Sequence, residues 1–163
     1  LKKRLLPTSS NKSEPYSDQG KIYELRTSKQ LLAIFQSIER KLVGEHCPNL
    51  LRASQEDVLT IDHIYPQSPE KWRIDIRKWE EIPSSYKVRV HTLGNLAVIP
   101  KSINSEMSNE RFLDKKDILA QNRFVRLEVN NEWQKTEISK WTPEKIDNRA
   151  ASLLETFLNY YPY

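Results

Sequence analysis

One short stretch constrains this chain more than any other: Val58-Leu-Thr-Ile-Asp-His-Ile-Tyr-Pro-Gln67. Apolar and β-branched residues dominate its first half, so it predicts a short strand that ends before Pro66. Asp62 and His63 are adjacent at the end of that strand. Neighbouring strand residues point to opposite faces, so both side chains can serve one site only where the strand bends, and Pro66 favours a bend.

A turn and a second strand are predicted further along the chain. The segment Thr92-Leu-Gly-Asn-Leu-Ala-Val-Ile99 begins with a turn dipeptide, Gly94-Asn95, and continues with apolar residues of high β-propensity. Asn104 comes just after Pro100, at the start of a polar segment with helical character. The chain therefore orders an Asp-His pair on a strand, an asparagine after a turn, a second strand, and an asparagine at a helix start.

This order resembles the ββα-metal, or His-Me finger, core of HNH nucleases. Several ordered blocks make the chain similar to one group in particular, the C-terminal HNH domain of GmrSD-type restriction endonucleases. The blocks are Asp62-His-Ile-Tyr-Pro-Gln-Ser68, Leu93-Gly-Asn-Leu96, Asn104, Ser108-Asn-Glu-Arg-Phe112 with Lys115 and Lys116, and Trp141-Thr-Pro-Glu-Lys-Ile-Asp-Asn-Arg149. The resemblance runs from about Val58 to Leu154, and ordered blocks are far more specific than one short motif.

The resemblance implies a role for the polar residues of these blocks. His63 would be the general base that takes a proton from water, and Asn95 would hold its imidazole by a hydrogen bond. Asp62 and Asn104 would bind a divalent metal ion, Mg²⁺ or Mn²⁺, through hard oxygen ligands. The residue before the motif histidine is often Glu in the resembled group, and Asp62 is a shorter carboxylate that can still bind a metal ion.

Some of these residues have an ordinary structural interpretation. Gly94-Asn95 is a common turn dipeptide, and the asparagines alone would be turn and cap residues. The resemblance implies that Lys115 and Lys116 bind DNA phosphates, whereas a solvated helix face would explain both lysines equally well. His91, just before the turn, is a rival base or an extra ligand, but no motif requires it.

The resemblance also implies a function. The chain would be a metal-dependent DNA endonuclease that nicks or cleaves foreign or modified DNA in phage defence, as the nuclease part of a larger restriction protein. Such proteins also use an upstream or separate nucleotide-hydrolysing sensor domain, and this chain has three glycines and no phosphate-binding glycine loop. Two other classes stay open: a catalytically silent nucleic-acid-binding module, and an RNA-cleaving HNH toxin, since the same chemistry cuts either polymer.

Composition sets the limits within which these expectations hold. The 163 residues, 37% of them hydrophobic, suffice for one domain with one core. With 26 basic and 22 acidic residues, the formal charge of +4 permits double-stranded DNA as a partner without demonstrating it. The single cysteine, Cys47, excludes an intramolecular disulfide and a paired-cysteine zinc site. No membrane-spanning or secretory segment is apparent, so a cytoplasmic location is expected.

The predicted fold class is α+β, mostly helical, with a small two-stranded sheet. Residues 1–20 are expected to form a linker or flexible arm, and residues 21–163 the nuclease domain. Helices are predicted for Thr27–Glu45, for most of Glu70–Glu81, for Asn109 to about Ala120 after Ser108 as N-cap, and from Pro143 after Thr142 as N-cap, with a turn at Ser84 and Ser85. The pattern of Asn122–Glu132 fits a helix, a strand or an irregular segment, and the resemblance favours a helix there.

Overall fold

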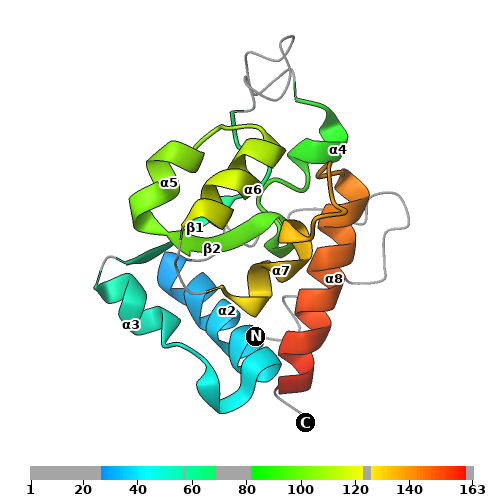
Figure 1. The fold of residues 1–163 in the computed structure, drawn as a ribbon. Coiled ribbons are helices and arrows are strands. Elements are labelled where there is room, and N and C mark those ends of the chain that lie inside the picture. Colours follow the sequence, from blue (N-terminus) through cyan, green and yellow to red (C-terminus); the bar gives the residue numbers. More distant parts are fainter. Residues whose placement is uncertain (1–26, 57, 69–81, 123–125, 161–163) are drawn as a thin grey trace.

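A two-stranded antiparallel sheet lies at the centre of the fold, with helices on both of its faces (Figure 1). The computed structural model describes residues 27–56, 58–68, 82–122 and 126–160. The prediction of a mostly helical α+β fold with one small sheet is confirmed. The expected arm, residues 1–20, and the expected helix Glu70–Glu81 lie outside the described residues.

The described elements are, in chain order, α2 (Ser28–Val43), η3 (Gly44–His46), α3 (Leu50–Gln55), β1 (Leu59–His63), α4 (Ser84–Lys87), η5 (Leu93–Asn95), β2 (Leu96–Pro100), α5 (Lys101–Met107), α6 (Phe112–Gln121), α7 (Glu128–Gln134) and α8 (Pro143–Tyr160). Among these helices, none is long and apolar enough to cross a membrane.

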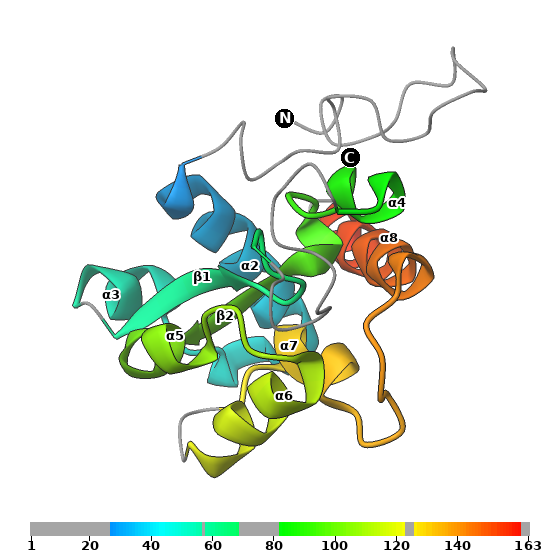
Figure 2. The ribbon, with the colours of Figure 1, turned by 90° about the horizontal axis from the view of Figure 1, so that it is seen from above.

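The two strands separate two hydrophobic clusters. Figures 1 and 2 show the helices on either side of the sheet that contribute to them. Directly paired residues of an antiparallel ladder share a face, and successive residues alternate between faces. The ladder pairs each residue of β1 with one of β2, from Leu59 with Pro100 to His63 with Leu96. One cluster joins Ile61, Leu96 and Val98 to α2 and α8 through Leu31, Phe35, Ile38, Leu153 and Phe157. The other joins Ala97 and Ile99 to Ile103, Met107, Phe112, Trp133 and Trp141.

Helix α2 forms much as its sequence predicts. The Thr27 side chain accepts a hydrogen bond from the Gln30 backbone, and the Gln30 side chain accepts one from the Thr27 backbone, which completes a capping box. Gly44 ends the helix with φ +68°, a conformation that glycine adopts without strain. Leu42 continues the helical spacing of the apolar residues of α2, but it is 47% exposed. The apolar part of the buried face ends at Ile38, so the last turn adds no side chain to the hydrophobic core.

A tertiary contact, rather than the local sequence, determines where helix α7 begins. The predicted helix Asn122–Glu132 is wrong in its start, because α7 begins at Glu128. The buried Glu39 carboxylate of α2 accepts hydrogen bonds from the backbone N–H groups of Glu128 and Val129, at 3.0 and 2.9 Å. A carboxylate at a helix N-terminus satisfies N–H groups that the helix itself leaves unpaired. Burial raises the pKa of Glu39, and these two hydrogen bonds offset part of that effect.

Other helix boundaries also differ from those predicted. Helix α6 starts at Phe112 after Arg111, and Ser108 is not its N-cap but the residue that ends α5, donating its N–H to the Asn104 carbonyl at 2.8 Å. The predicted turn after Pro83 is the short helix α4. The start of α8 is confirmed, because the Thr142 hydroxyl accepts a hydrogen bond from the Lys145 backbone.

Candidate active site

The end of β1 meets the turn η5, and the backbones of Asp62, His63 and Asn95 lie at this junction. His63 is the last residue of β1 and pairs with Leu96. The next residue, Ile64, donates its N–H to the Asn95 carbonyl at 2.8 Å. The chain then bends at Ile64 and Tyr65. For Asp62 and His63 to point into one site, the strand would have to bend at His63 itself, so the bend comes one residue too late.

Asp62 and His63 are therefore directed to opposite faces at the same end of the sheet. Asp62 pairs with Ala97, whose side chain belongs to the cluster beneath α5 and α6. His63 pairs with Leu96, whose side chain belongs to the cluster with α2 and α8. The ladder is unbroken through His63, so the alternation of a strand holds for both residues. A ligand in contact with both side chains has to lie across the end of β1.

Lys115 of α6 is the direct partner of Asp62. Its Nζ lies 3.1 Å from Asp62 Oδ2 and donates to the His63 carbonyl oxygen at 2.6 Å. The Lys115 side chain is 0% exposed, whereas that of Asp62 is 19% exposed. Burial lowers the pKa of Lys115, and the Asp62 carboxylate counteracts that shift. The prediction that Lys115 binds a DNA phosphate is corrected, because its ammonium group is enclosed and already paired.

The inward position of Lys115 follows from its helical spacing. Residues three apart lie on one face of a helix, and Lys115 follows the buried Phe112 by three positions. A lysine on the buried face of a helix requires a carboxylate partner, since an isolated buried charge is costly. That spacing is the sequence signal that places Lys115 on the buried face of its helix, although it does not identify Asp62 as the partner.

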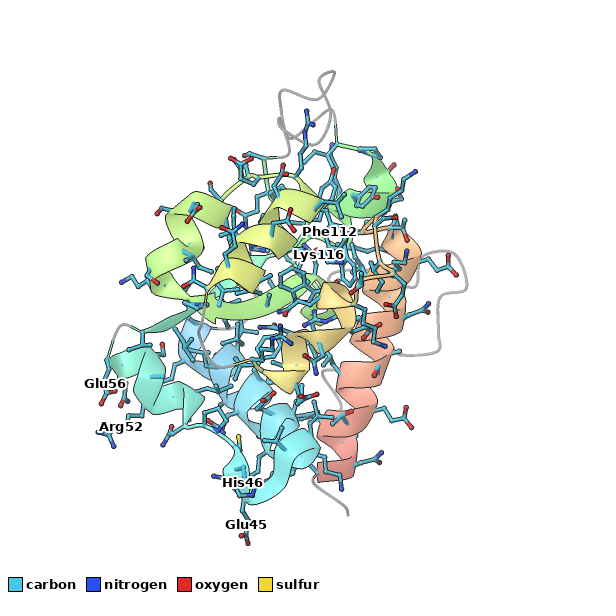
Figure 3. All side chains as sticks on the ribbon, in the orientation of Figure 1. Glu45, His46, Arg52, Glu56, Phe112 and Lys116 are labelled. Atoms are coloured by element: carbon cyan, nitrogen blue, oxygen red, sulfur yellow. The ribbon has the colours of Figure 1, made fainter. Side chains whose placement is uncertain are left out.

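Lys116 has a different structural role from the one predicted. Its Nζ donates to the carbonyl oxygens of Lys135 and Ile138, at 2.6 and 2.8 Å. It also lies 5.6 Å from the centroid of the Phe112 ring, beside which Figure 3 labels it. Lys116 thus holds the segment that follows α7 against α6. The binding of a DNA phosphate by Lys116 stays a prediction, because these two hydrogen bonds use only two of the three N–H groups of its ammonium.

Asn95 organises the backbone around the site. Its side chain is fully buried. Oδ1 accepts hydrogen bonds from the Tyr65 N–H at 2.8 Å and the Trp141 indole at 3.1 Å, and Nδ2 donates to the carbonyls of Tyr65 and Val90, each at 2.9 Å. These four bonds use the amide's hydrogen-bonding capacity. Asn95 therefore holds the loop after His63, and the predicted hydrogen bond to the imidazole is wrong.

The hydrogen-bonded partner of the His63 ring is another imidazole. His63 Nε2 lies 3.2 Å from His91 Nδ1, and the two rings meet nearly edge to face, at 82°. The side chains are only 6% and 8% exposed. Burial, followed by the neighbouring His91 and Lys115, lowers the pKa of His63 to about 3. At neutral pH the His63 imidazole is consequently neutral, which is the form that can accept a proton.

The block from Trp141 to Arg149 makes hydrogen bonds to η5 and to the start of β2. Arg149 is fully buried, and its guanidinium donates to the carbonyls of Gly94, Leu96 and Val129 at 2.7, 2.8 and 2.7 Å. Burial lowers the pKa of Arg149 to about 10, so the group stays charged at neutral pH. Trp141 stacks on Phe112, with ring centroids 5.7 Å apart. The residues of this block thus act on the site through the backbone of η5 and β2.

A family model described as "GmrSD restriction endonucleases, C-terminal domain" matches residues 10–156. The chain belongs to this family. Membership identifies the GmrSD domain as a nuclease module of a restriction endonuclease, and it implies nuclease activity on a DNA substrate. Searches among curated proteins and among solved structures found no match.

The predicted metal ligands are suited to a hard cation. Asp62 is partly exposed, and Lys115 contacts only its Oδ2, so Oδ1 is a second oxygen that can bind a metal ion. Asn104 lies within α5 and not at its start, and this helix packs against both strands. Among residues 27–56, 58–68, 82–122 and 126–160, no three His, Cys, Asp or Glu side chains are grouped to hold a metal ion. The donor set of one carboxylate and one amide fits Mg²⁺ or Mn²⁺, which retain several waters.

Replacing Lys115 by Met is expected to destabilise the GmrSD domain by about 2 kcal/mol, because the Asp62 carboxylate and the His63 carbonyl lose a buried donor. Urea unfolding measures this cost. In the background of Asp62→Asn, the same substitution should cost at least ~1 kcal/mol less, since the carboxylate is already absent.

Lys41→Met is the matched control, because Lys41 is an exposed lysine in the last turn of α2. It should change the free energy of unfolding by no more than about 0.5 kcal/mol. Equal costs of Lys115→Met with and without the Asp62 carboxylate would show that the ion pair does not stabilise the fold.

Proposed function

We propose that this GmrSD domain is a metal-dependent DNA endonuclease in which His63 accepts the proton of the attacking water. The observation that carries the proposal is the buried, neutral imidazole of His63, which is the last residue of β1 and follows Asp62 directly in the chain. Hydrolysis of a phosphodiester needs a base within reach of a water and positive charge at the phosphate. The end of β1 supplies the base and a ligand for the charge.

His63 supplies the base. A pKa of about 3 keeps the ring unprotonated, but it also makes the ring a weak proton acceptor in the absence of substrate. A bound phosphodiester carries negative charge, and negative charge beside an imidazole favours its protonated form. Binding of DNA across the end of β1 would therefore raise the basicity of His63 at the step that requires it.

Asp62 and Asn104 would hold the divalent metal ion. When bound, such an ion neutralises the scissile phosphate and stabilises the departing oxygen. The protein residues keep their own tasks: Lys115 orients Asp62 through Oδ2, and the position of α5 against both strands sets where Asn104 lies. Two protein ligands leave most of the coordination positions to water and substrate.

The same proposal places the domain in a larger system. As the nuclease part of a restriction protein, it would cut or nick foreign or modified DNA in defence against phage. Its partner would be an upstream or separate nucleotide-hydrolysing domain that recognises the DNA. The family match to restriction endonucleases supports this assignment.

The deciding experiment incubates the protein with supercoiled plasmid and, separately, with structured RNA, each in Mg²⁺, Mn²⁺ or EDTA. Nicked or linear plasmid should form with a divalent ion and not with EDTA, and the RNA should remain intact. Cleavage of RNA alone would indicate an RNA-directed toxin instead. Salt-sensitive DNA binding without strand breaks under any condition would indicate a silent binding module.

A further inference from the structure

We propose that His91 is a positioning residue that fixes the tautomer of His63 through the Nε2···Nδ1 contact, so that Nδ1 of His63 carries the lone pair that accepts a proton. The proposal rests on the assignment of His63 as the general base. It adds a residue to the site that the resemblance to HNH nucleases did not call for. The contact is 3.2 Å long and links residues 28 positions apart in sequence.

The hydrogen bond between the two rings constrains the tautomer of each. A neutral imidazole has one N–H and one nitrogen with a lone pair. Both rings are buried, and the lowered pKa of His63 keeps its imidazole neutral at neutral pH. A hydrogen bond between Nε2 of His63 and Nδ1 of His91 therefore contains a single proton, which belongs to one of the two nitrogens.

Only one of the two arrangements is compatible with a base at His63. If His63 Nε2 accepted the proton from His91, its own Nδ1 would carry the N–H, and no lone pair would remain for water. If His63 Nε2 donates to His91 Nδ1, the lone pair stays on His63 Nδ1. The second arrangement makes His91 the acceptor, and it orients the His63 ring as well as setting its tautomer.

The backbone that carries His91 is well fixed. Asn95 Nδ2 donates both to the Val90 carbonyl, directly before His91, and to the Tyr65 carbonyl, shortly after His63. One amide group thus ties the two imidazole-bearing segments together. Arg89 makes a two-point ion pair with Asp147 of α8, at 2.7 and 2.8 Å. Asn95 acts on His63 indirectly, by holding the turn on which His91 lies.

The tautomer can be read without any assay of activity. The chain has three histidines, so a two-bond proton–nitrogen correlation spectrum of the ¹⁵N-labelled protein contains few ring signals. Single substitutions of His46 and His91 assign them. We expect His63 in the wild-type protein to be protonated at Nε2 and unprotonated at Nδ1. A neutral His63 ring with its proton on Nδ1 would overturn the proposal. A His63 ring that carries protons on both nitrogens would also overturn it.

Substitutions of His91 test whether it sets this state. Asn places its amide near the position of Nδ1, and Gln places it near that of Nε2, so His91→Asn is the conservative change and His91→Gln its mismatched control. His91→Ala should give averaged His63 tautomers and reduce the rate of plasmid cleavage by roughly tenfold to a hundredfold, with DNA binding unchanged. His91→Asn should restore the single tautomer and most of the rate, and His91→Gln should restore less.

The outcomes separate this proposal from the one on which it rests. A single Nε2-protonated tautomer that persists in His91→Ala would show that His91 does not set it. The expected tautomers together with full cleavage by a His63 variant would contradict the base assignment and leave the histidine pair intact. If His91→Ala fails to fold, the wild-type spectrum and the Asn and Gln variants still decide.

Discussion

Replacing Gly94 by Ala is expected to lower the free energy of unfolding by about 3 kcal/mol or more. A Cβ atom on Gly94 would lie 2.0 Å from the Ile146 carbonyl oxygen and 2.9 Å from the Ala150 backbone nitrogen. Both atoms belong to the backbone of α8, which cannot move aside as a flexible side chain can. Thermal or urea unfolding measures the loss, which for a domain of this size corresponds to a fall in Tm of roughly 6–12 °C.

Gly44→Ala is the matched control for this substitution. Gly44 has φ +68°, and a Cβ there would meet no atom within 4 Å. Ala at this position should cost about 2 kcal/mol, from the strain of a positive φ combined with ψ −135°. A Gly94 variant as stable as the wild type, or less affected than the Gly44 variant, would contradict the close approach of η5 to α8.

The Gly94 substitution should also affect the site. Arg149 of α8 donates to the Gly94 carbonyl, and the neighbouring Asn95 holds the segments that carry His63 and His91. Displacing η5 from α8 disturbs both sets of hydrogen bonds. We therefore expect cleavage to fall with stability in Gly94→Ala, whereas Gly44→Ala should cut at the wild-type rate.

Local patterns were sufficient to predict the framework of the fold. The apolar and β-branched residues that begin at Val58, the turn dipeptide at Gly94-Asn95, and the periodicity of α2 and α8 depend on neighbouring residues only. The boundaries of elements that depend on residues far away in sequence were predicted less accurately. Helix α7 starts at Glu128 because Glu39, far away in sequence, caps it, and no local signal reports that contact.

The sequence names the candidate site residues but not their contacts. The ordered blocks identified Asp62, His63 and Asn95, which the structure places at the junction of β1 and η5. The partners of these residues depend on tertiary packing: Asp62 meets Lys115, and His63 meets His91. A lysine or histidine has the same identity in the sequence whether it is buried and paired or exposed. Only the spacing of Lys115 from Phe112 hinted at the difference.

His63→Ala is expected to reduce plasmid cleavage by at least about a hundredfold, because it removes the proton acceptor. DNA binding in EDTA should stay close to that of the wild type, since the substitution removes a neutral side chain that is 6% exposed. The unfolding midpoint of His63→Gln is compared with that of the wild type. A variant that folds normally but does not cleave has lost the base and not the fold. His46→Ala is the matched control, because His46 is exposed at the end of the molecule away from Phe112 and Lys116 (Figure 3).

The rate of plasmid cleavage by His63→Ala beside His46→Ala, in Mg²⁺ or Mn²⁺, tests the account most directly. We predict full cleavage by the His46 variant, and DNA binding with almost no cleavage by the His63 variant. Cleavage by His63→Ala at the wild-type rate would contradict the assignment of His63 as the base, and so would a parallel loss of cleavage and DNA binding in a folded variant.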